Sequence, residues 1–333
     1  MSGIIETARQ LVSPGKGLLA ADESLPTIKK RFDPQGIAST EETRRAYRDL
    51  LFTTPGMENC ISGVILFEET LRQATASGDP FPQLLAKRGI IPGIKVDAGT
   101  APLGADTTET MTKGLEGLPE RLSDFRRRGA RFAKWRAVIH IDGDRLPTAA
   151  AISANATSLA RYARDCQDAD LTPIVEPEVL MDGSQNIDRS ADVTRATLDA
   201  VFKALDKAGV RLEGMLLKPN MVVPGAHSGQ TQTPEQIADA TLECLRSSVP
   251  PQVPGILFLS GGQSPEVSTR NLRAIVRRAG AAPWRLSFSF GRALQDEALA
   301  AWKGRSQNLE AAQSAFLRRA EILSEAVRAP SGR

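Results

Sequence analysis

The chain has 333 residues, of which 41% are hydrophobic and 24% charged, with a formal net charge of +3. It is long enough to bury a large core, and we expect one domain over residues 1–333, with residues 329–333 frayed. No run of 18 apolar residues predicts a membrane span, and no signal peptide is indicated. The weak charge with few aromatics does not favour nucleic-acid binding. We expect a cytoplasmic protein, because its three cysteines are few, widely spaced and interpreted as reduced.

In chain order, the pattern begins with an apolar helix face formed by Ile4, Ile5, Ala8, Leu11 and Val12. Eight short apolar or β-branched runs follow and predict strands at Gly17–Ala21, Ser62–Phe67, Pro92–Val96, Ala133–Ile141, Thr172–Glu176, Gly214–Lys218, Gly255–Ser260 and Leu286–Phe290. Amphipathic helical patterns lie between them, including 150–169, 188–208, 234–247, 292–303 and 307–328.

Strands that alternate with helices predict parallel pairing through right-handed crossovers. Eight such units favour a closed (β/α)8 barrel with extra terminal helices over an open doubly wound sheet, because no G-x-G-x-x-G follows the first strand. Two helix starts are expected from their capping residues: Ser39 with Glu42 as a capping box, and Ser264 with Pro265 at the first helical position.

The scarcity of metal-binding residues argues against a metal centre. There are only two histidines, His140 and His227, and three widely spaced cysteines without a CxxC pair: Cys60, Cys166 and Cys244. We interpret the cysteines as reduced and structural, and we expect no metal cofactor.

Ionisable residues at the expected strand ends are the main functional signal. They include Asp22 after the first strand, Lys95 in the third, Lys134 and Arg136 in the fourth, Glu176 and Glu178 in the fifth, and Lys218 at the end of the sixth. Because burying unpaired charge is costly, a ring of such residues indicates a site. In a barrel, that site lies at the carboxyl ends of the strands.

Three lysines in strand-like runs suggest carbon–carbon bond chemistry. Apolar surroundings and neighbouring cations both lower the pKa of a lysine, and a neutral amine attacks a ketone to form a Schiff base. The residues alone do not decide whether Lys218, Lys134 or Lys95 is the nucleophile.

Glycines directly after the last two strands predict a phosphate site. Gly261-Gly262 and Gly291-Arg292 each precede a helix, where backbone N–H groups bind anions and an arginine adds a bidentate donor.

Seven motifs, in this order, give the chain a resemblance to a known family. They are Leu18–Ser24, Gly93–Asp97, Phe132–Arg136, Ile174–Glu178, Leu216–Asn220, Leu259–Gln263 and Phe290–Leu294, within residues 3–325. The chain resembles the class I (Schiff-base) fructose-bisphosphate aldolases. The resemblance implies reversible, metal-independent cleavage of fructose 1,6-bisphosphate to dihydroxyacetone phosphate and glyceraldehyde 3-phosphate. It also implies a homotetramer in glycolysis, gluconeogenesis or a related pathway.

The resemblance further implies roles for matching residues. Lys218 matches the lysine that forms the imine with the C2 ketone, and Asp22 the carboxylate that takes the proton of the C4 hydroxyl. Glu176 matches the acid and base for imine formation and hydrolysis, with Lys134 beside it and Glu178 in support.

The implied substrate-binding residues fall into two groups. Ser260, Gly262, Gly291 and Arg292 match the site of the phosphate nearest the ketone, and Ser24, Thr27, Arg31 and Lys95 match the region of the other phosphate. Gly261, Ser289 and Arg136 at the same strand ends complete the expected set.

Several of these residues have a structural alternative. Asp22 could cap a helix, Lys95 could neutralise Asp97, and Glu176 and Glu178 could pair with arginines.

Two departures from the family pattern stand out. The chain ends Ala329-Pro330-Ser331-Gly332-Arg333 without the terminal tyrosine of many relatives, so we expect enamine protonation to use water or another residue. His140 stands where relatives often have lysine.

Two other functions stay open at this stage. One is a lysine-dependent aldolase for a seven-carbon bisphosphate or a monophosphate, and the other is a binding scaffold without activity.

Overall fold

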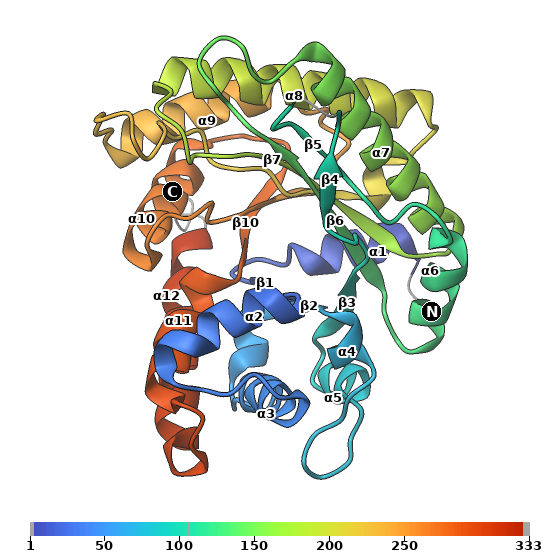
Figure 1. Ribbon diagram of the computed structural model, residues 1–333, viewed down its shortest axis with the longest axis vertical. Helices are drawn as coiled ribbons and strands as arrows, with labels where there is room; N and C mark the ends of the chain where they lie inside the picture. The colour runs from blue at the N-terminus through green and yellow to red at the C-terminus, as the bar shows by residue number, and fades with distance from the viewer. Residues whose placement is uncertain (1–2, 105–106, 329–333) are drawn as a thin grey trace.

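Eight parallel strands close into a barrel, which confirms the expected (β/α)8 architecture (Figure 1). The computed structural model describes residues 3–104 and 107–328, so the expectation for residues 329–333 lies outside the described residues. Going round the barrel the order is β1-β10-β9-β8-β7-β6-β3-β2. These strands are β1 (Gly17–Ala21), β2 (Ile61–Leu66), β3 (Ile91–Lys95), β6 (Phe132–Ile139), β7 (Thr172–Val179), β8 (Leu216–Leu217), β9 (Gly255–Phe258) and β10 (Arg285–Phe290).

The helices form an outer layer around the strands (Figure 1). The five helical stretches expected from periodicity agree with α7, α8, α9, α11 and α12 to within two residues at each end. Ser264 caps α10 as expected, because its hydroxyl accepts a hydrogen bond from the Val267 N–H at 3.2 Å. The helices are α1 (Ile4–Leu11), α2 (Leu25–Phe32), α3 (Glu41–Phe52), α4 (Glu68–Leu71), α5 (Phe81–Lys87), α6 (Leu118–Arg127), α7 (Ala149–Asp168), α8 (Ile187–Lys207), α9 (Pro234–Ser248), α10 (Pro265–Arg278), α11 (Arg292–Trp302) and α12 (Leu309–Val327).

The capping box expected at the start of α3 is shifted by one residue. Thr40, rather than Ser39, is the N-cap, and Thr40 and Thr43 exchange hydrogen bonds between hydroxyl and backbone N–H at 3.0 and 3.1 Å. Glu42 instead forms an ion pair with Arg45 at 2.8 Å. Two adjacent hydroxyl residues compete for the cap here, and the threonine at N3 closes the box that a glutamate was expected to close.

Helix α1 covers the amino-terminal mouth of the barrel. Ala8, Leu11 and Val12 are buried, and they pack in one cluster with barrel residues such as Leu18 and Phe132. Of the expected apolar face, only Ile4 and Ile5 stay partly exposed. Because this mouth is covered, the carboxyl ends of the strands are left as the open end.

A small sheet that the sequence pattern did not predict lies beside the barrel. Strand β4 (Thr100–Pro102) pairs antiparallel with β5 (Thr110–Thr112). The Thr112 hydroxyl donates a hydrogen bond to the Arg136 carbonyl at 2.7 Å, which joins this hairpin to β6.

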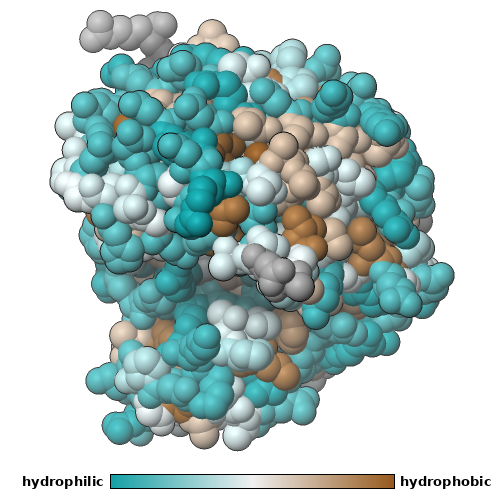
Figure 2. All heavy atoms as spheres, turned by 45° about the horizontal axis from the view of Figure 1, so that its top comes forward, coloured by the Kyte–Doolittle hydropathy of each residue, from teal (hydrophilic) through white to brown (hydrophobic). Residues whose placement is uncertain are grey.

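The surface is largely hydrophilic on the face that Figure 2 shows, with small hydrophobic patches. Within the described residues, no helix is both long and apolar enough to cross a membrane. The three cysteines are buried and free of disulfide bonds, in agreement with their expected structural role.

Candidate active site

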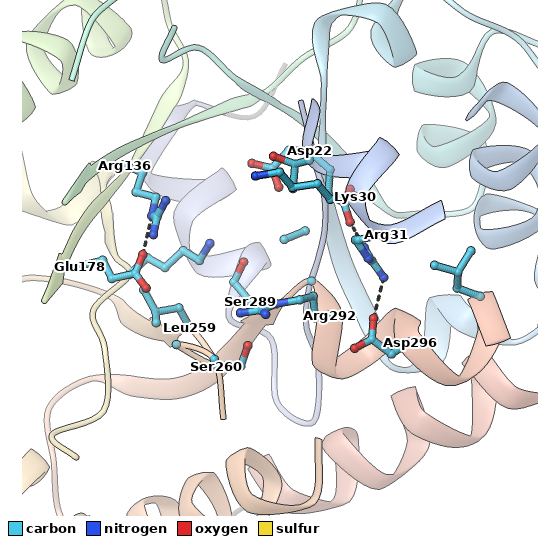
Figure 3. A pocket seen from close by; sticks show the side chains of 18 of the residues that line it. Asp22, Lys30, Arg31, Arg136, Glu178, Leu259, Ser260, Ser289, Arg292 and Asp296 are labelled. Atoms are coloured by element: carbon cyan, nitrogen blue, oxygen red, sulfur yellow. Dashed lines mark hydrogen bonds and ion pairs between the residues drawn. The ribbon is translucent and has the colours of Figure 1, made fainter. Parts of the chain in front are cut away.

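A cavity of about 650 Å³ opens at the carboxyl ends of the strands (Figure 3). Strand ends of β1, β6, β7, β8, β9 and β10 contribute to its wall, together with α2 and α11. The cavity brings together twelve of the expected site residues: Asp22, Thr27, Arg31, Arg136, Glu178, Lys218, Ser260, Gly261, Gly262, Ser289, Gly291 and Arg292.

The remaining four expected residues lie outside the lining. Lys134 and Glu176 are buried directly behind it, since Lys134 contacts Asp22 and Glu176 contacts Lys218. Ser24 caps α2, and its hydroxyl lies 2.9 Å from that of Thr27. Lys95 is the fourth expected residue that does not line the cavity. Because Ser24 is the N-cap, the alternative that Asp22 caps this helix is wrong.

Six buried or nearly buried charges form one connected group, which we call the charged cluster: Lys95, Lys134, Lys218, Asp22, Asp97 and Glu176. Lys134 Nζ lies 2.8 Å from Asp22, 3.3 Å from Glu176 and 3.8 Å from Asp97. Lys218 Nζ lies 2.8 Å from the other oxygen of Glu176. Three ammonium groups thus face three carboxylates, so the cluster as a whole is neutral.

The cations of the cluster keep its carboxylates ionised. Burial alone would raise the pKa of Asp22, but the Lys134 ammonium, with Lys218 and Lys95, outweighs it and lowers that pKa to about 2. Burial likewise opposes ionisation of Glu176, and Lys134, Lys218 and Arg136 reverse the effect, so its pKa is lowered. Both carboxylates are therefore bases at neutral pH.

The expectation that the three lysines lower one another's pKa is wrong for Lys134. Burial would lower its pKa, but Asp22, Glu176 and Asp97 raise it above the ordinary value. Strands β3 and β6 do bring Lys95 and Lys134 into register. Carboxylates lie between the ammonium groups, however, so attraction outweighs repulsion.

Lys95 and Asp97 form the local pair that was the structural alternative for this lysine. Lys95 Nζ lies 2.5 Å from the Asp97 carboxylate and 2.8 Å from the Asp97 carbonyl. The Lys95 side chain is 15% exposed and does not line the cavity. Asp97 also approaches Lys134, so it belongs to the site, although it was not among the expected site residues.

Arg136 and Glu178 form an ion pair across β6 and β7 (Figure 3). The arginine alternative for Glu178 is therefore right, whereas the nearest cations to Glu176 are the lysines. Glu176 and Glu178 are two residues apart in an extended strand, so both point to the same side of β7. Glu176 reaches the charged cluster, and Glu178 lines the cavity.

One wall of the cavity has the features of an anion site. Gly261 and Gly262 follow β9 with φ of +59° and +87°, a region that favours glycine. Gly291 caps α11, and Arg292 is the first residue of that helix. The N–H groups of α11 therefore face the cavity beside a guanidinium, an arrangement that binds phosphate.

The part of the cavity wall formed by α2 differs, because its arginine is already paired. Arg31 of α2 contacts Glu23, Gln295 and Asp296. Lys30, Glu23 and Asp296 also line the cavity, although sequence reasoning did not select them. For Glu23, its position next to Asp22 could have been a signal, whereas nothing local connects Asp296 with α2.

Neither histidine belongs to the cavity. His140 follows the last residue of β6, and His227 is exposed in the loop before α9. Among residues 3–104 and 107–328 there is no group of three or more His, Cys, Asp or Glu side chains that could hold a metal ion.

Comparisons with known proteins agree with this geometry. The family model described as "Glycolytic: Fructose-bisphosphate aldolase class-I" matches residues 3–330. The chain is 53% identical to fructose-bisphosphate aldolase 5, cytosolic, of Arabidopsis thaliana, over 97% of this chain and 90% of that protein. It is 50% identical to a probable fructose-bisphosphate aldolase class 1 of Xanthomonas campestris, over 96% and 95%.

A solved structure is similar over the whole barrel. It is fructose-bisphosphate aldolase from Plasmodium falciparum in complex with TRAP and a small molecule inhibitor, with a TM-score of 0.96 and 48% identity, covering 99% of this chain and 95% of that one. The resemblance inferred from the seven motifs is thereby confirmed. The chain belongs to the class I fructose-bisphosphate aldolases, the metal-independent lyases that reversibly cleave fructose 1,6-bisphosphate to dihydroxyacetone phosphate and glyceraldehyde 3-phosphate through a Schiff base.

Proposed function

We propose that Lys218 is the nucleophile of this reaction and that Glu176 moves the protons of imine formation. Three observations support the choice of Lys218: its side chain is 5% exposed, it lines the cavity, and its Nζ lies 2.8 Å from Glu176. Lys134 does not line the cavity, and its raised pKa keeps the amine protonated and non-nucleophilic. Lys95 is occupied by Asp97.

The steps follow from these positions. Glu176 takes a proton from Lys218, the amine adds to the C2 ketone, and Glu176 returns the proton to the departing hydroxyl as water. Asp22 then removes the proton of the C4 hydroxyl. The C3–C4 bond breaks, an aldehyde leaves, and the bond electrons pass to the protonated imine, which becomes an enamine. Protonation at C3 and hydrolysis release dihydroxyacetone phosphate and regenerate Lys218.

The role of Asp22 rests on its ionisation. A pKa of about 2 leaves this carboxylate free to accept a proton at neutral pH, while the adjacent Lys134 stabilises the charges that change during the reaction. Glu178 is proposed as the supporting carboxylate, held by Arg136 at the cavity wall.

For the phosphates, we assign the wall of glycines and Arg292 to the group nearest the ketone. Ser260, Gly261, Gly262, Ser289 and Gly291 line the same cavity as Lys218 and Arg292, and Figure 3 shows Ser260 and Ser289 near Arg292. For the other phosphate we assign Ser24, Thr27, Arg31 and Lys95. Two bound phosphates would hold C2 and C4 between Lys218 and Asp22.

The wider setting is also a proposal. We propose one domain, a homotetramer, a cytoplasmic location, and no nucleic-acid or membrane partner. Relatives named as cytosolic support the location. We also propose that a group other than tyrosine protonates the enamine. Tyr47 and Tyr162 are completely buried and do not line the cavity, and the chain end lies outside the described residues.

Borohydride trapping tests the nucleophile directly. We expect reduction in the presence of dihydroxyacetone phosphate and EDTA to leave a stable adduct on the peptide containing Lys218. An adduct on Lys134 or Lys95 would keep the reaction class but overturn the assignment. If folded protein forms no adduct, the imine proposal fails. Cleavage rates on a seven-carbon bisphosphate and on fructose 1-phosphate, measured beside fructose 1,6-bisphosphate, establish the substrate preference.

A further inference from the structure

Arg31 lines the cavity, and its charge is already balanced by carboxylates. Its Nη2 donates to Asp296 at 2.9 Å, and its Nη1 contacts Glu23 and, at 3.2 Å, the Gln295 side chain. Figure 3 shows Arg31 pointing toward Asp296 rather than toward Arg292. The Arg31 side chain is only 9% exposed; both Nη atoms are engaged by these contacts, and its Nε is buried without a hydrogen-bond partner.

The charges around this arginine cancel. Glu23 is shared between Arg31 and the buried Arg48, whose guanidinium donates to it at 2.6 Å. With Asp296, this group holds two arginines and two carboxylates, and it presents no net positive charge to an incoming phosphate. In the part of the chain that the structure describes, Arg292 and Lys30 line the same cavity without any ion pair.

Asp296 is the member of this group that can change without disturbing the core. Its side chain is 49% exposed and lines the cavity, whereas that of Glu23 is 10% exposed and bound to two arginines. It lies one helical turn after Arg292 on α11, so its carboxylate faces the same cavity from the same helix. A phosphate bound near Arg31 meets a negative charge there.

We infer that Asp296 is a specificity-determining residue that competes with the second phosphate of the substrate for Arg31. This inference rests on the proposed assignment of Arg31 to that phosphate. Binding a bisphosphate must break or weaken the Arg31–Asp296 pair, whereas a monophosphate that carries only the phosphate nearest the ketone leaves the pair intact. Asp296 therefore lowers the preference of this enzyme for a bisphosphate over fructose 1-phosphate.

The test compares Asp296→Asn with wild type on both substrates, using an assay of dihydroxyacetone phosphate, which both release. We expect the KM for fructose 1,6-bisphosphate to fall by about three- to fivefold, the scale of one exposed ion pair. The KM for fructose 1-phosphate and kcat on either substrate should not change. The decrease in KM for fructose 1,6-bisphosphate should be smaller at high salt, because the Asp296 carboxylate is partly exposed and therefore screened.

Glu297→Gln is a matched control. Glu297 is the next residue of α11, is 40% exposed and pairs at 3.5 Å with a buried arginine, Arg319, but it does not line the cavity. We expect it to leave both KM values unchanged. If it lowers the bisphosphate KM as much as Asp296→Asn does, the effect belongs to net charge and the inference fails.

Arg31→Gln distinguishes the assignment of Arg31 to the second phosphate from the competition by Asp296. If this variant leaves the bisphosphate KM unchanged, Arg31 is not a phosphate contact and the proposed assignment fails. If it raises that KM while Asp296→Asn leaves it unchanged or raises it, the assignment survives and only the competition is refuted. A rise would mean that Asp296 orients Arg31 for binding. The double variant should show no further effect of Asp296→Asn.

Discussion

Replacing Lys134 with methionine removes a buried cation that lies within 3.8 Å of three carboxylates. The charged cluster then carries a net charge of −1, and burial raises the pKa of Asp22 and Glu176 without its main opposing charge. In wild type the pKa of Asp22 is about 2, against an ordinary value of 3.8. A return of this pKa to 3.8 would by itself lower the free energy of unfolding at neutral pH by about 2 kcal/mol. Removing one partner of a buried ion pair typically lowers the free energy of unfolding by about 3–5 kcal/mol, so we expect Lys134→Met to be destabilised by an amount in that range.

The cleavage rate should fall together with the stability. Asp22 and Glu176 serve as bases in the proposed steps, and general acid–base catalysis contributes about 10²–10⁴-fold. Single-turnover cleavage should slow by that order, and the acid limb of the pH profile should move to higher pH. Denaturant unfolding at one fixed protein concentration measures the stability, because the unfolding of a homotetramer, as proposed here, depends on protein concentration.

A suitable control is Lys87→Met, which removes the same side chain from an exposed ion pair with Asp79 at 3.0 Å. Such pairs contribute about 0–1 kcal/mol, so this variant should resemble wild type in stability and activity. If Lys134→Met is as stable and as active as Lys87→Met, the three contacts of Lys134 do not govern the ionisation of the site, and the electrostatic account of this cluster is refuted.

Two further results are expected. In wild type, the folded-state pKa of Asp22 is lowered, so its stabilising effect is present above pH 3.8 and is lost as the pH falls toward 2. Asp22→Asn should therefore lose about 1 kcal/mol less of its unfolding free energy than wild type between pH 5 and pH 3, and an equal loss would contradict the lowered pKa. Cleavage should be unaffected by dialysis against EDTA, and a loss of rate that divalent metal restores would argue against the imine route.

The strand ends were predictable because each strand is a local apolar run. Buried parallel strands are continuous apolar runs, and such runs can be recognised locally. The motifs therefore identified cavity residues at the ends of β1, β6, β7, β9 and β10. Strand β8 keeps only Leu216 and Leu217 in the ladder, yet Lys218 still lies at its end. The β4–β5 hairpin was missed because three-residue strands carry too little periodicity to be seen.

The pairing of charges was not predictable, because the register of distant elements decides it. The sequence contains three lysines at strand ends, and from that alone mutual repulsion is the natural expectation. The register of β3 with β6 does bring Lys95 beside Lys134, but it also brings Asp97 close to both. The sign of the pKa shift at Lys134 therefore depends on contacts among four strands. Arg31 and Asp296 are 265 residues apart, and they meet only because α2 and α11 lie close together at the cavity. Sequence motifs thus identify most residues of this site, whereas the charge balance among them depends on the folded arrangement.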